Sequence, residues 1–409
     1  MKRLLCIGMI LMMGVAPAVG ASGDVLDRFQ EKVRRFTLDN GMTFLVVSRN
    51  RAPVASFVAF IDVGGVDEPA GQTGIAHFLE HLAFKGTPEI GTRNWKKEKR
   101  ALEKVDRAYA DWLQARYGPR AHPDKDAQAL RRKFEALREK AGQYVVPNAY
   151  AKILERHGAE SLNAGTSQDY TLYFCSLPAN RVELWFNLES DRLRRPVFRQ
   201  FFKEKQVVLE ERRMRIESDP TGRMIEELQA LAYMAHPYGM PTIGWNRDII
   251  TTTRADMRAF HDRHYHPDNM TVAVVGDVSP DRIKTLAETY FGSMTSKPTE
   301  PNYITREPDQ DSERAFTRRG PNHPVYLEAY HGVDQLHKDA GSLDILADIL
   351  ARGRVSRLYE QLVVQEGLAQ SVEVFNGFPG DRYPGLFLVH AIPRRDVSLD
   401  ELSTAIPCH

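Results

Sequence analysis

Two histidines and a glutamate lie within five residues of one another, in the segment His77-Phe78-Leu79-Glu80-His81. If this segment is helical, His77, Glu80 and His81 share one face, because residues three and four apart are neighbours on a helix. Two imidazoles at this spacing suit a divalent metal such as zinc, and the carboxylate beside them suits a base. The pattern is the inverted form of a zinc-protease motif. The alternative is a surface helix that carries two histidines by chance.

A third metal ligand is expected from a predicted helix over residues 201–218. At helical pitch, one face of this helix carries Glu204, Val207, Val208 and Glu211. Because the valines should be buried, they carry both glutamates inward, and a buried carboxylate needs a cation or a hydrogen-bonded partner. Helix phase therefore favours Glu211 over its neighbour Glu210 as the third ligand, with Glu204 as a supporting carboxylate. The alternative is that both glutamates pair with basic neighbours at the surface.

Composition places the chain among ordinary globular proteins. Its 409 residues are enough for two or three domains, and 27% are charged and 42% hydrophobic. The net charge of +1 gives no general attraction to nucleic acid, so we expect no nucleic-acid partner. Cys175 and Cys408 are too far apart in sequence to indicate a disulfide framework, and Cys175 is expected to be a buried free thiol.

The N-terminus has the pattern of a secretory signal peptide. Lys2 and Arg3 precede an apolar run to about Ala16, and small residues follow around Gly20. The run is shorter than the roughly 20 residues of a membrane-spanning helix, which argues against an anchor. We therefore expect cleavage of residues 1–20, no membrane span in the mature chain, and a periplasmic or secreted protein.

Hydrophobic patterning predicts alternating strands and helices around the metal motif. Strands are predicted at residues 33–38, 42–47, 54–63, 170–177 and 270–275. Helices are predicted at residues 150–157, 181–194, 253–264 and 280–290. Residues 161–166 predict a turn, and residues 236–244 predict an ordered loop. These elements make up a predicted catalytic domain at residues 21–295.

Residues 94–142 have a different pattern. Apolar residues recur three or four apart on both sides of Gly118-Pro119, which predicts an inserted helical hairpin with coiled-coil-like packing. Residues 96–140 contain 14 Lys and Arg against 8 Asp and Glu. We interpret the hairpin as a solvated insertion that hangs off the catalytic core. A lid, a partner contact or a basic face for an acidic surface are the alternatives.

The C-terminal part repeats the same order of elements. After a proline-rich linker at residues 296–313, strands are predicted at residues 325–330, 371–375 and 385–392. Helices are predicted at residues 340–350 and 354–365, and from Ser398 onward. The sequence therefore predicts an α+β protein of two related domains, each a mixed sheet with helices packed on one face. The second domain, at residues 314–409, is expected to be incomplete.

The order of these motifs resembles the insulinase and mitochondrial processing peptidase superfamily, particularly its bacterial secreted members. The resemblance rests on residues 71–87, Asn163-Ala164 before an aromatic strand, and residues 204–211, 236–239 and 274–277. The gap from His81 to Glu211 is 211 − 81 = 130 residues. The family usually has roughly 75 here, and removing the roughly 55-residue hairpin restores that spacing.

The resemblance implies a zinc-dependent endopeptidase that acts on peptides or small unfolded proteins. It makes His77, His81 and Glu211 the ligands of one zinc ion per chain, and Glu80 the general base. It makes Glu204 a supporting catalytic carboxylate. It also implies that an extended substrate pairs as an added strand with the backbone at Asn163 and Ala164.

One part of the family pattern is missing. Active single-chain relatives usually offer an Arg and a Tyr from a later domain to grip substrate, but Val363 and Gln370 stand where the resemblance places them. We therefore expect the metal-bearing subunit of a two-subunit enzyme, with a partner subunit that holds no metal or with a second copy of the chain. The alternative is a non-catalytic structural or peptide-binding subunit of the same fold.

Overall fold

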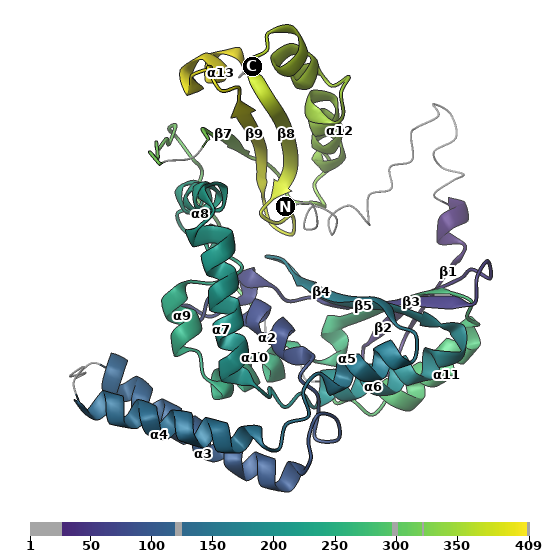
Figure 1. Ribbon diagram of the computed structural model, residues 1–409. Coiled ribbons are helices and arrows are strands. Elements are labelled where there is room, and N and C mark those ends of the chain that lie inside the picture. The colour runs from purple at the N-terminus through teal and green to yellow at the C-terminus, as the bar shows by residue number, and fades with distance from the viewer. Residues whose placement is uncertain (1–26, 119–124, 297–301, 321–322, 407–409) are drawn as a thin grey trace.

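The structure, a computed structural model, describes residues 27–118, 125–296, 302–320 and 323–406. Figure 1 shows a large sheet with helices on one face, a long helical hairpin below α7 and α9 at the lower left, and a second, smaller sheet. The predicted signal peptide and Cys408 lie outside the described residues. Within the described ranges, none of the helices combines the length and the apolar character needed to cross a bilayer.

The first domain is built on a six-stranded mixed sheet. Its strands are β1 (Val33–Thr37), β2 (Thr43–Ser48), β3 (Val54–Ile61), β4 (Glu160–Thr166), β5 (Thr171–Pro178) and β6 (Met270–Gly276). Their order across the sheet is β1-β2-β6-β3-β5-β4. The pairing of β2 with β6 is parallel, and the others are antiparallel. The last of these strands in sequence, β6, therefore lies in the middle of the sheet, between β2 and β3.

Helices cover one face of this sheet. Alternate residues of the central strands are buried, among them Phe57, Tyr173 and Val272, because successive side chains of a strand point to opposite faces. The covering helices include α2 (Ile75–Ala83), α6 (Val182–Arg194) and α11 (Pro280–Phe291). The opposite face is partly open to solvent, as at Val54 and Val275. Cys175 is buried in this core and free, as predicted.

The predicted turn at residues 161–166 is wrong, because these residues form most of edge strand β4. The sequence Asn163-Ala164-Gly165 has low strand propensity, but pairing with β5 overrides it. A register shift between Glu160 and Asn163 accompanies a positive φ of 54° at Ser161. In the described part of the chain, β4 has a neighbouring strand on one side and none on the other.

The predicted helix over residues 201–218 is present in two parts. Helix α7 covers Phe201–Arg212, and a π-helical segment continues it over Arg213–Glu217. Val208 and Glu204 are buried, but Val207 is 42% exposed, so its predicted burial is wrong. Adjacent helical residues differ by about 100° around the axis, and Val208 alone of the two valines faces inward.

The remaining helices of the first domain agree in outline with the patterning. They are α5 (Ala149–Arg156), α8 (Pro220–Ala232), α9 (Asn246–Thr251) and α10 (Arg254–His264). The predicted loop at residues 236–244 contains one short 3-10 turn, Pro237–Gly239. A capping box between Thr253 and Asp256 begins α10, because each residue satisfies a backbone N–H of the other.

The predicted helical hairpin is present as α3 (Trp95–Tyr117) and α4 (Lys125–Gly142), which lie side by side in Figure 1. Its apolar stripe is buried, including Val105 and Phe134. The middle of α3 also packs on α7, with the rings of Tyr109 and Phe202 centred 4.5 Å apart. The hairpin was interpreted as a solvated insertion that hangs off the catalytic core, but its apolar face packs on that core.

The second domain repeats the strand order of half of the first. Its elements are β7 (Tyr326–His331), α12 (Ala340–Ala351), η6 (Tyr359–Gln365), β8 (Ala369–Phe378), β9 (Leu386–Pro393) and α13 (Leu399–Ala405). The order β7-β9-β8 matches β3-β5-β4, and α12 follows β7 as α2 follows β3. This correspondence supports two related domains.

One predicted helix of the second domain begins late. Residues 352–356 form bends and turns, with a positive φ of 81° at Gly353, so the helix predicted over residues 354–365 begins at Arg357. From Tyr359 onward it is π-helical. A turn over residues 353–356 delays the helix, because the Ser356 N–H and hydroxyl both donate to the Gly353 carbonyl oxygen, and the apolar pattern does not reveal this turn.

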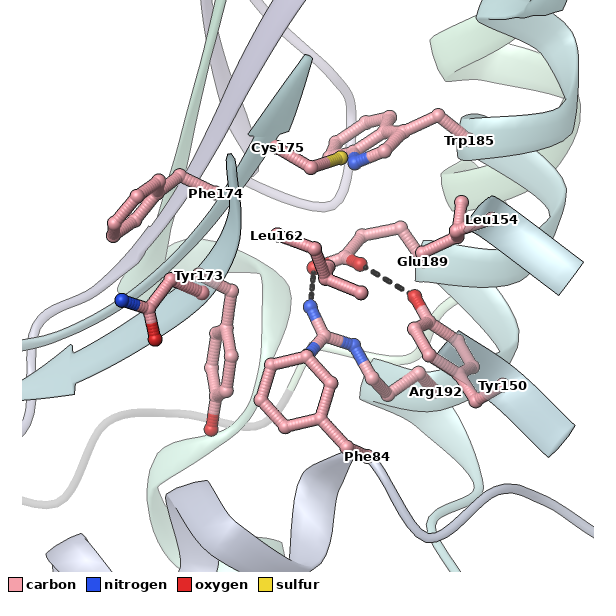
Figure 2. A pocket seen from close by; sticks show the side chains of 11 residues that line it. Phe84, Tyr150, Leu154, Leu162, Tyr173, Phe174, Cys175, Trp185, Glu189 and Arg192 are labelled. Carbon is pink, nitrogen blue, oxygen red and sulfur yellow. Dashed lines mark hydrogen bonds and ion pairs between the residues drawn. The ribbon is translucent and has the colours of Figure 1, made fainter. Parts of the chain in front are cut away.

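A buried ion pair within α6 faces β5 (Figure 2). Arg192 hydrogen-bonds Glu189, and the Tyr150 hydroxyl donates to the Glu189 Oε2 at 3.1 Å. The Arg192 guanidinium also lies 4.1 Å from the ring centroid of Tyr173. Burial of Arg192 is tolerated because the carboxylate and the aromatic rings replace part of its hydration.

We expect Glu189→Gln to lower the free energy of unfolding by about 3–5 kcal/mol, because it leaves the Arg192 charge buried without its counter-ion. Urea denaturation followed by circular dichroism measures this change. Glu183→Gln on the same helix is the control, since Glu183 is at the surface and accepts a hydrogen bond from Tyr290. A loss at Glu189 no larger than at Glu183 would contradict the prediction.

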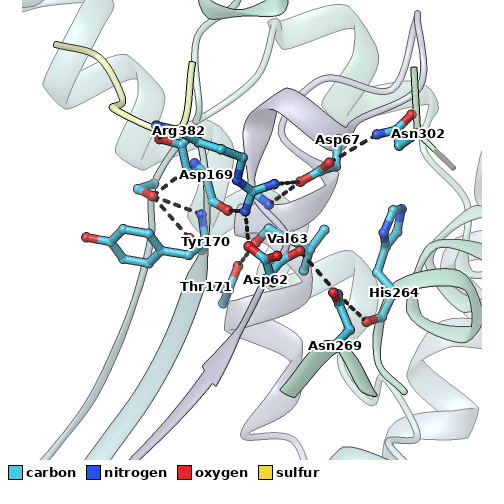
Figure 3. Close-up of polar contacts among 12 residues, drawn as sticks. Asp62, Val63, Asp67, Asp169, Tyr170, Thr171, His264, Asn269, Asn302 and Arg382 are labelled. Atoms are coloured by element: carbon cyan, nitrogen blue, oxygen red, sulfur yellow. Dashed lines mark hydrogen bonds and ion pairs between the residues drawn. The ribbon is translucent and has the colours of Figure 1, made fainter. Parts of the chain in front are cut away.

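The two domains meet at Arg382, which lies in the β8–β9 connection (Figure 3). Its guanidinium contacts the carboxylate of Asp62, the backbone oxygen of Asp169, and, at 3.6 Å, the carboxylate of Asp67. The Asp169 carboxylate accepts the backbone N–H of Arg382 at 3.2 Å and the Tyr238 hydroxyl at 2.6 Å. The second domain is thus fixed to the turn that joins β4 to β5.

Candidate metal centre

Helix α2 places three polar side chains opposite its apolar face. Phe78, Leu79 and Leu82 are buried in the core of the first domain. The helix begins after Gly74, whose φ is 84°, and the Glu68 carboxylate accepts the backbone N–H of Gly74 at 2.7 Å and of Ala76 at 2.9 Å. A carboxylate at a helix N-terminus stabilises the helix. His77, Glu80 and His81 are therefore held on the face toward α7 and β4.

The predicted ligands meet at one point between α2 and α7. The Glu211 Oε2 lies 3.7 Å from the His77 Nε2 and 3.3 Å from the His81 Nε2. One ligand atom from each residue lies within 4.8 Å of the others, and no other such group of three occurs in the described ranges. Ligand atoms about 2.0–2.1 Å from a tetrahedral zinc ion are about 3.4 Å apart, so these donors fit zinc.

Glu204 lies on α7, two turns before the ligand Glu211, and contacts the ligand His81 of α2. Its Oε2 lies 3.7 Å from the His81 Nδ1, and its Oε1 accepts a 2.8 Å contact from the Lys85 Nζ. Lys85 was absent from the predicted site. It lies in the turn that follows α2, two residues beyond Ala83. Arg215 is a second cation beside the site, since it contacts the Glu211 Oε1 at 2.9 Å.

Thr166 at the end of β4 forms a hydrogen bond with Glu80. Its hydroxyl donates to the Glu80 Oε2 at 2.8 Å, across 86 residues of sequence. Burial raises the pKa of Glu80 above its ordinary value, which suits a base at neutral pH. Sequence reasoning missed Thr166. Its one local signal is the alternation that places it on the same side of the strand as Ala164.

Asn163 and Ala164 lie in β4, three and two residues before Thr166. The Asn163 side chain accepts the backbone N–H of Ala164 at 2.9 Å. The two residues pair with Phe174 and Tyr173 of β5. The structure therefore brings His77, Glu80, His81, Glu204 and Glu211 together between α2 and α7, and it places Asn163 and Ala164 in the strand whose Thr166 contacts Glu80.

The two histidines have opposite electrostatic environments. Burial, together with the nearby His81, lowers the pKa of His77 to about 4. Burial opposes the charge on His81 as well, but its contacts with Glu204 and Glu211 raise its pKa to about 9. The same histidine contacts overcome burial at Glu211 and lower its pKa to about 2. Without metal at pH 7, one histidine is therefore neutral and the other is protonated.

Zinc binding at pH 7 is expected to release one proton, from His81. A ligand imidazole must be neutral, and His77 and Glu211 already hold their metal-binding forms at that pH. The zinc dissociation constant should therefore rise about tenfold for each unit by which pH falls below 9. Calorimetry in buffers of different ionisation enthalpy counts the protons. Release of none, or of two, would contradict the prediction.

Comparison with known proteins agrees with this geometry. The profile of a family described as "Insulinase (Peptidase family M16)" matches residues 44–130 and 138–245, and that of "Peptidase M16 inactive domain" matches residues 251–406. The chain belongs to the insulinase family, M16. The first profile contains all seven predicted site residues. The gap in its match, at residues 131–137, falls within the inserted hairpin.

Several known proteins are similar over nearly the whole chain. Zinc protease PqqE of Helicobacter pylori is 28% identical over 399 residues, which are 96% of this chain and 76% of the relative. A crystal structure of a Helicobacter pylori protease has a TM-score of 0.73 at 27% identity, over 91% and 77% of the two chains. A probable mitochondrial-processing peptidase subunit beta of Arabidopsis thaliana is 24% identical, over 95% and 64%.

Proposed function

We propose that this chain is the metal-bearing component of a zinc-dependent endopeptidase. The observation that carries the proposal is the convergence of His77, His81 and Glu211 beside the buried carboxylate of Glu80. Relatives named zinc proteases support the metal and the reaction class. We further propose one zinc ion per chain, held by the two Nε2 atoms and the Glu211 carboxylate.

The proposed reaction is hydrolysis of a peptide bond. When bound, zinc supplies Lewis-acid polarisation of a carbonyl group and acidification of water. Glu80 takes the proton from the attacking water on its Oε1, because its Oε2 is engaged by Thr166. Glu204 accepts contacts from Lys85 and His81, and so orients the His81 imidazole for its ligand role.

The proposed substrate is an extended peptide or a small unfolded protein. An edge strand offers unpaired backbone groups, to which a peptide adds as a further strand. β4 is such a strand, and Thr166 at its end contacts Glu80, so a peptide paired at Asn163 and Ala164 would run past the base. Backbone pairing does not demand one substrate sequence.

We also propose that a second subunit completes the substrate site. Val363 and Gln370 stand where the family pattern places an Arg and a Tyr, and Arg357 nearby is exposed on the second domain. One relative is named as a subunit of a processing peptidase, which supports pairing. Hydrolysis of a quenched peptide by the purified zinc-loaded chain, with and without its partner, tests this. Full activity of the isolated monomer would overturn the two-subunit proposal.

A non-catalytic subunit is the second candidate. The description "inactive domain" for the profile matched by residues 251–406 favours it. Those residues lie outside the segment that contains the metal site, and a scaffold has no need of a base beside three ligands. Zinc analysis combined with the peptide assay separates the two candidates. Bound zinc with no turnover, even with a partner, would indicate a peptide-binding or structural role.

We propose a periplasmic or secreted location on the basis of the signal-peptide pattern at residues 1–20. Cell fractionation followed by N-terminal sequencing of the mature protein tests this. The expected result is a mature N-terminus near Ala21 in the periplasm or medium. An uncleaved N-terminus in the cytoplasmic fraction would overturn the proposal.

A further inference from the structure

The helical hairpin contacts α7 directly and reaches the turn that follows α2 through Arg199. Its first contact is aromatic, since Phe202 on α7 lies against both helices of the hairpin. The ring of Phe202 is centred 4.5 Å from Tyr109 of α3 and 4.7 Å from Phe134 of α4. The start of α7 is thus covered by the hairpin.

The second contact is a buried lysine on α7. Lys205 follows Glu204 in the sequence and is 3% exposed. Its Nζ donates to the Tyr109 hydroxyl at 2.9 Å and to the carbonyl oxygens of Ile250 and Thr252 at 2.8 and 2.6 Å. The Tyr109 hydroxyl in turn donates to the Ile250 oxygen at 2.6 Å. A buried ammonium group with three directed acceptors fixes the rotation of its helix.

The third contact is a buried ion pair that reaches the end of α2. The Arg199 Nε donates to the Glu98 Oε1 of α3 at 2.7 Å, and both side chains are almost fully buried. The Arg199 NH1 donates to the carbonyl oxygens of Ile90 at 2.7 Å and Lys85 at 3.3 Å. Lys85 is the residue that contacts Glu204. A continuous set of contacts therefore joins the hairpin to the carboxylate beside His81.

We propose that the hairpin is a brace for the metal centre, with Glu98 and Tyr109 as positioning residues that set zinc affinity. Glu98 holds the backbone at Lys85 through Arg199, and Tyr109 holds α7 through Lys205. Ligands on two separate helices bind a metal tightly only if the helices keep their relative rotation, because a metal site needs its donors within about 0.5 Å of the productive geometry. The inference rests on the proposed zinc site.

The test uses the full chain with Glu98→Gln and, separately, Tyr109→Phe. Both keep the shape of the side chain. The first removes the negative charge that pairs with buried Arg199, and the second removes the hydroxyl that accepts from Lys205 of α7. We expect the zinc dissociation constant, measured by competition with a chromophoric chelator, to rise about 10–100-fold, as for other supporting partners of metal ligands. Glu135→Gln is the matched control, since it breaks an exposed ion pair with Arg131 on the same hairpin and should leave zinc affinity unchanged.

Hydrogen exchange of the backbone of α7 provides a second readout that needs no metal. The brace predicts at least tenfold faster exchange over residues 201–212 in both variants. Glu135→Gln should exchange at the wild-type rate over the same residues. If Glu98→Gln fails to fold, Tyr109→Phe carries the test alone. Folded variants with wild-type zinc affinity and wild-type exchange would overturn the brace. A wild-type chain that binds no zinc would instead overturn the proposed function. The hydrogen-exchange rates of α7 in the variants would still test whether the hairpin acts as a brace.

Discussion

The variant Glu80→Gln is expected to lower kcat for peptide hydrolysis by about 10²–10⁴-fold while zinc content stays at the wild-type level. A general base contributes about that factor, and glutamine cannot accept the proton from water. Glutamine keeps the length of the side chain and can still accept the Thr166 hydroxyl, so the fold should persist. Hydrolysis of a quenched peptide, with metal analysis of the same sample, measures both quantities.

The outcome separates the two candidate functions. If Glu80→Gln loses activity but retains zinc, the result supports the peptidase, because loss of the metal would not explain the loss of activity. Thr166→Ser serves as a control, since it preserves the hydroxyl that contacts Glu80 and should keep most of the activity. If Glu80→Gln retained wild-type kcat, Glu80 would not be the base.

The variant Glu211→Gln is expected to weaken zinc binding by more than the roughly 10–100-fold loss that removal of a supporting residue causes. The neutral amide replaces an anionic ligand in a set of three donors. It also leaves His77 and His81 without the carboxylate that lies 3.7 and 3.3 Å from them. Chelator competition measures the dissociation constant, and peptide hydrolysis should fall in parallel.

Glu210→Gln is the matched control for Glu211→Gln, because the two glutamates are adjacent on α7. Glu210 is exposed and accepts hydrogen bonds from Arg213 at 2.8 and 2.5 Å, away from the metal centre. Its replacement should leave zinc affinity and activity unchanged. Equal losses in the two variants would show that charge on α7, and not coordination, controls binding.

Local spacing was enough to find the donors of the candidate site. The three-and-four spacing of His77, Glu80 and His81 is a property of any helix, and helix phase alone separated Glu211 from Glu210. The same reasoning wrongly predicted that Val207 is buried, since the spacing of apolar residues does not show how wide the buried face of a short helix is. Periodicity gives the direction of a face but not the width of what covers it.

Contacts between distant segments could not be read from the sequence. Residues 161–166 look like a turn, and only pairing with β5 makes them the edge strand that presents Thr166 to Glu80. The hairpin was recognisable from its apolar spacing, but its anchor between Tyr109 and Lys205 joins residues 96 positions apart. Amphipathic spacing says which side of a helix is buried, and leaves open which element buries it.

The sequence by itself determined the types and spacing of the donors, the α+β order of elements and the presence of the hairpin, because these depend on short-range periodicity. The tertiary structure decided what the donors face. It joined α2 to α7 across 130 residues, placed β4 at the edge beside Glu80, and set Lys85 against Glu204. Such contacts depend on how whole elements pack, and neighbouring residues in the chain carry no record of them.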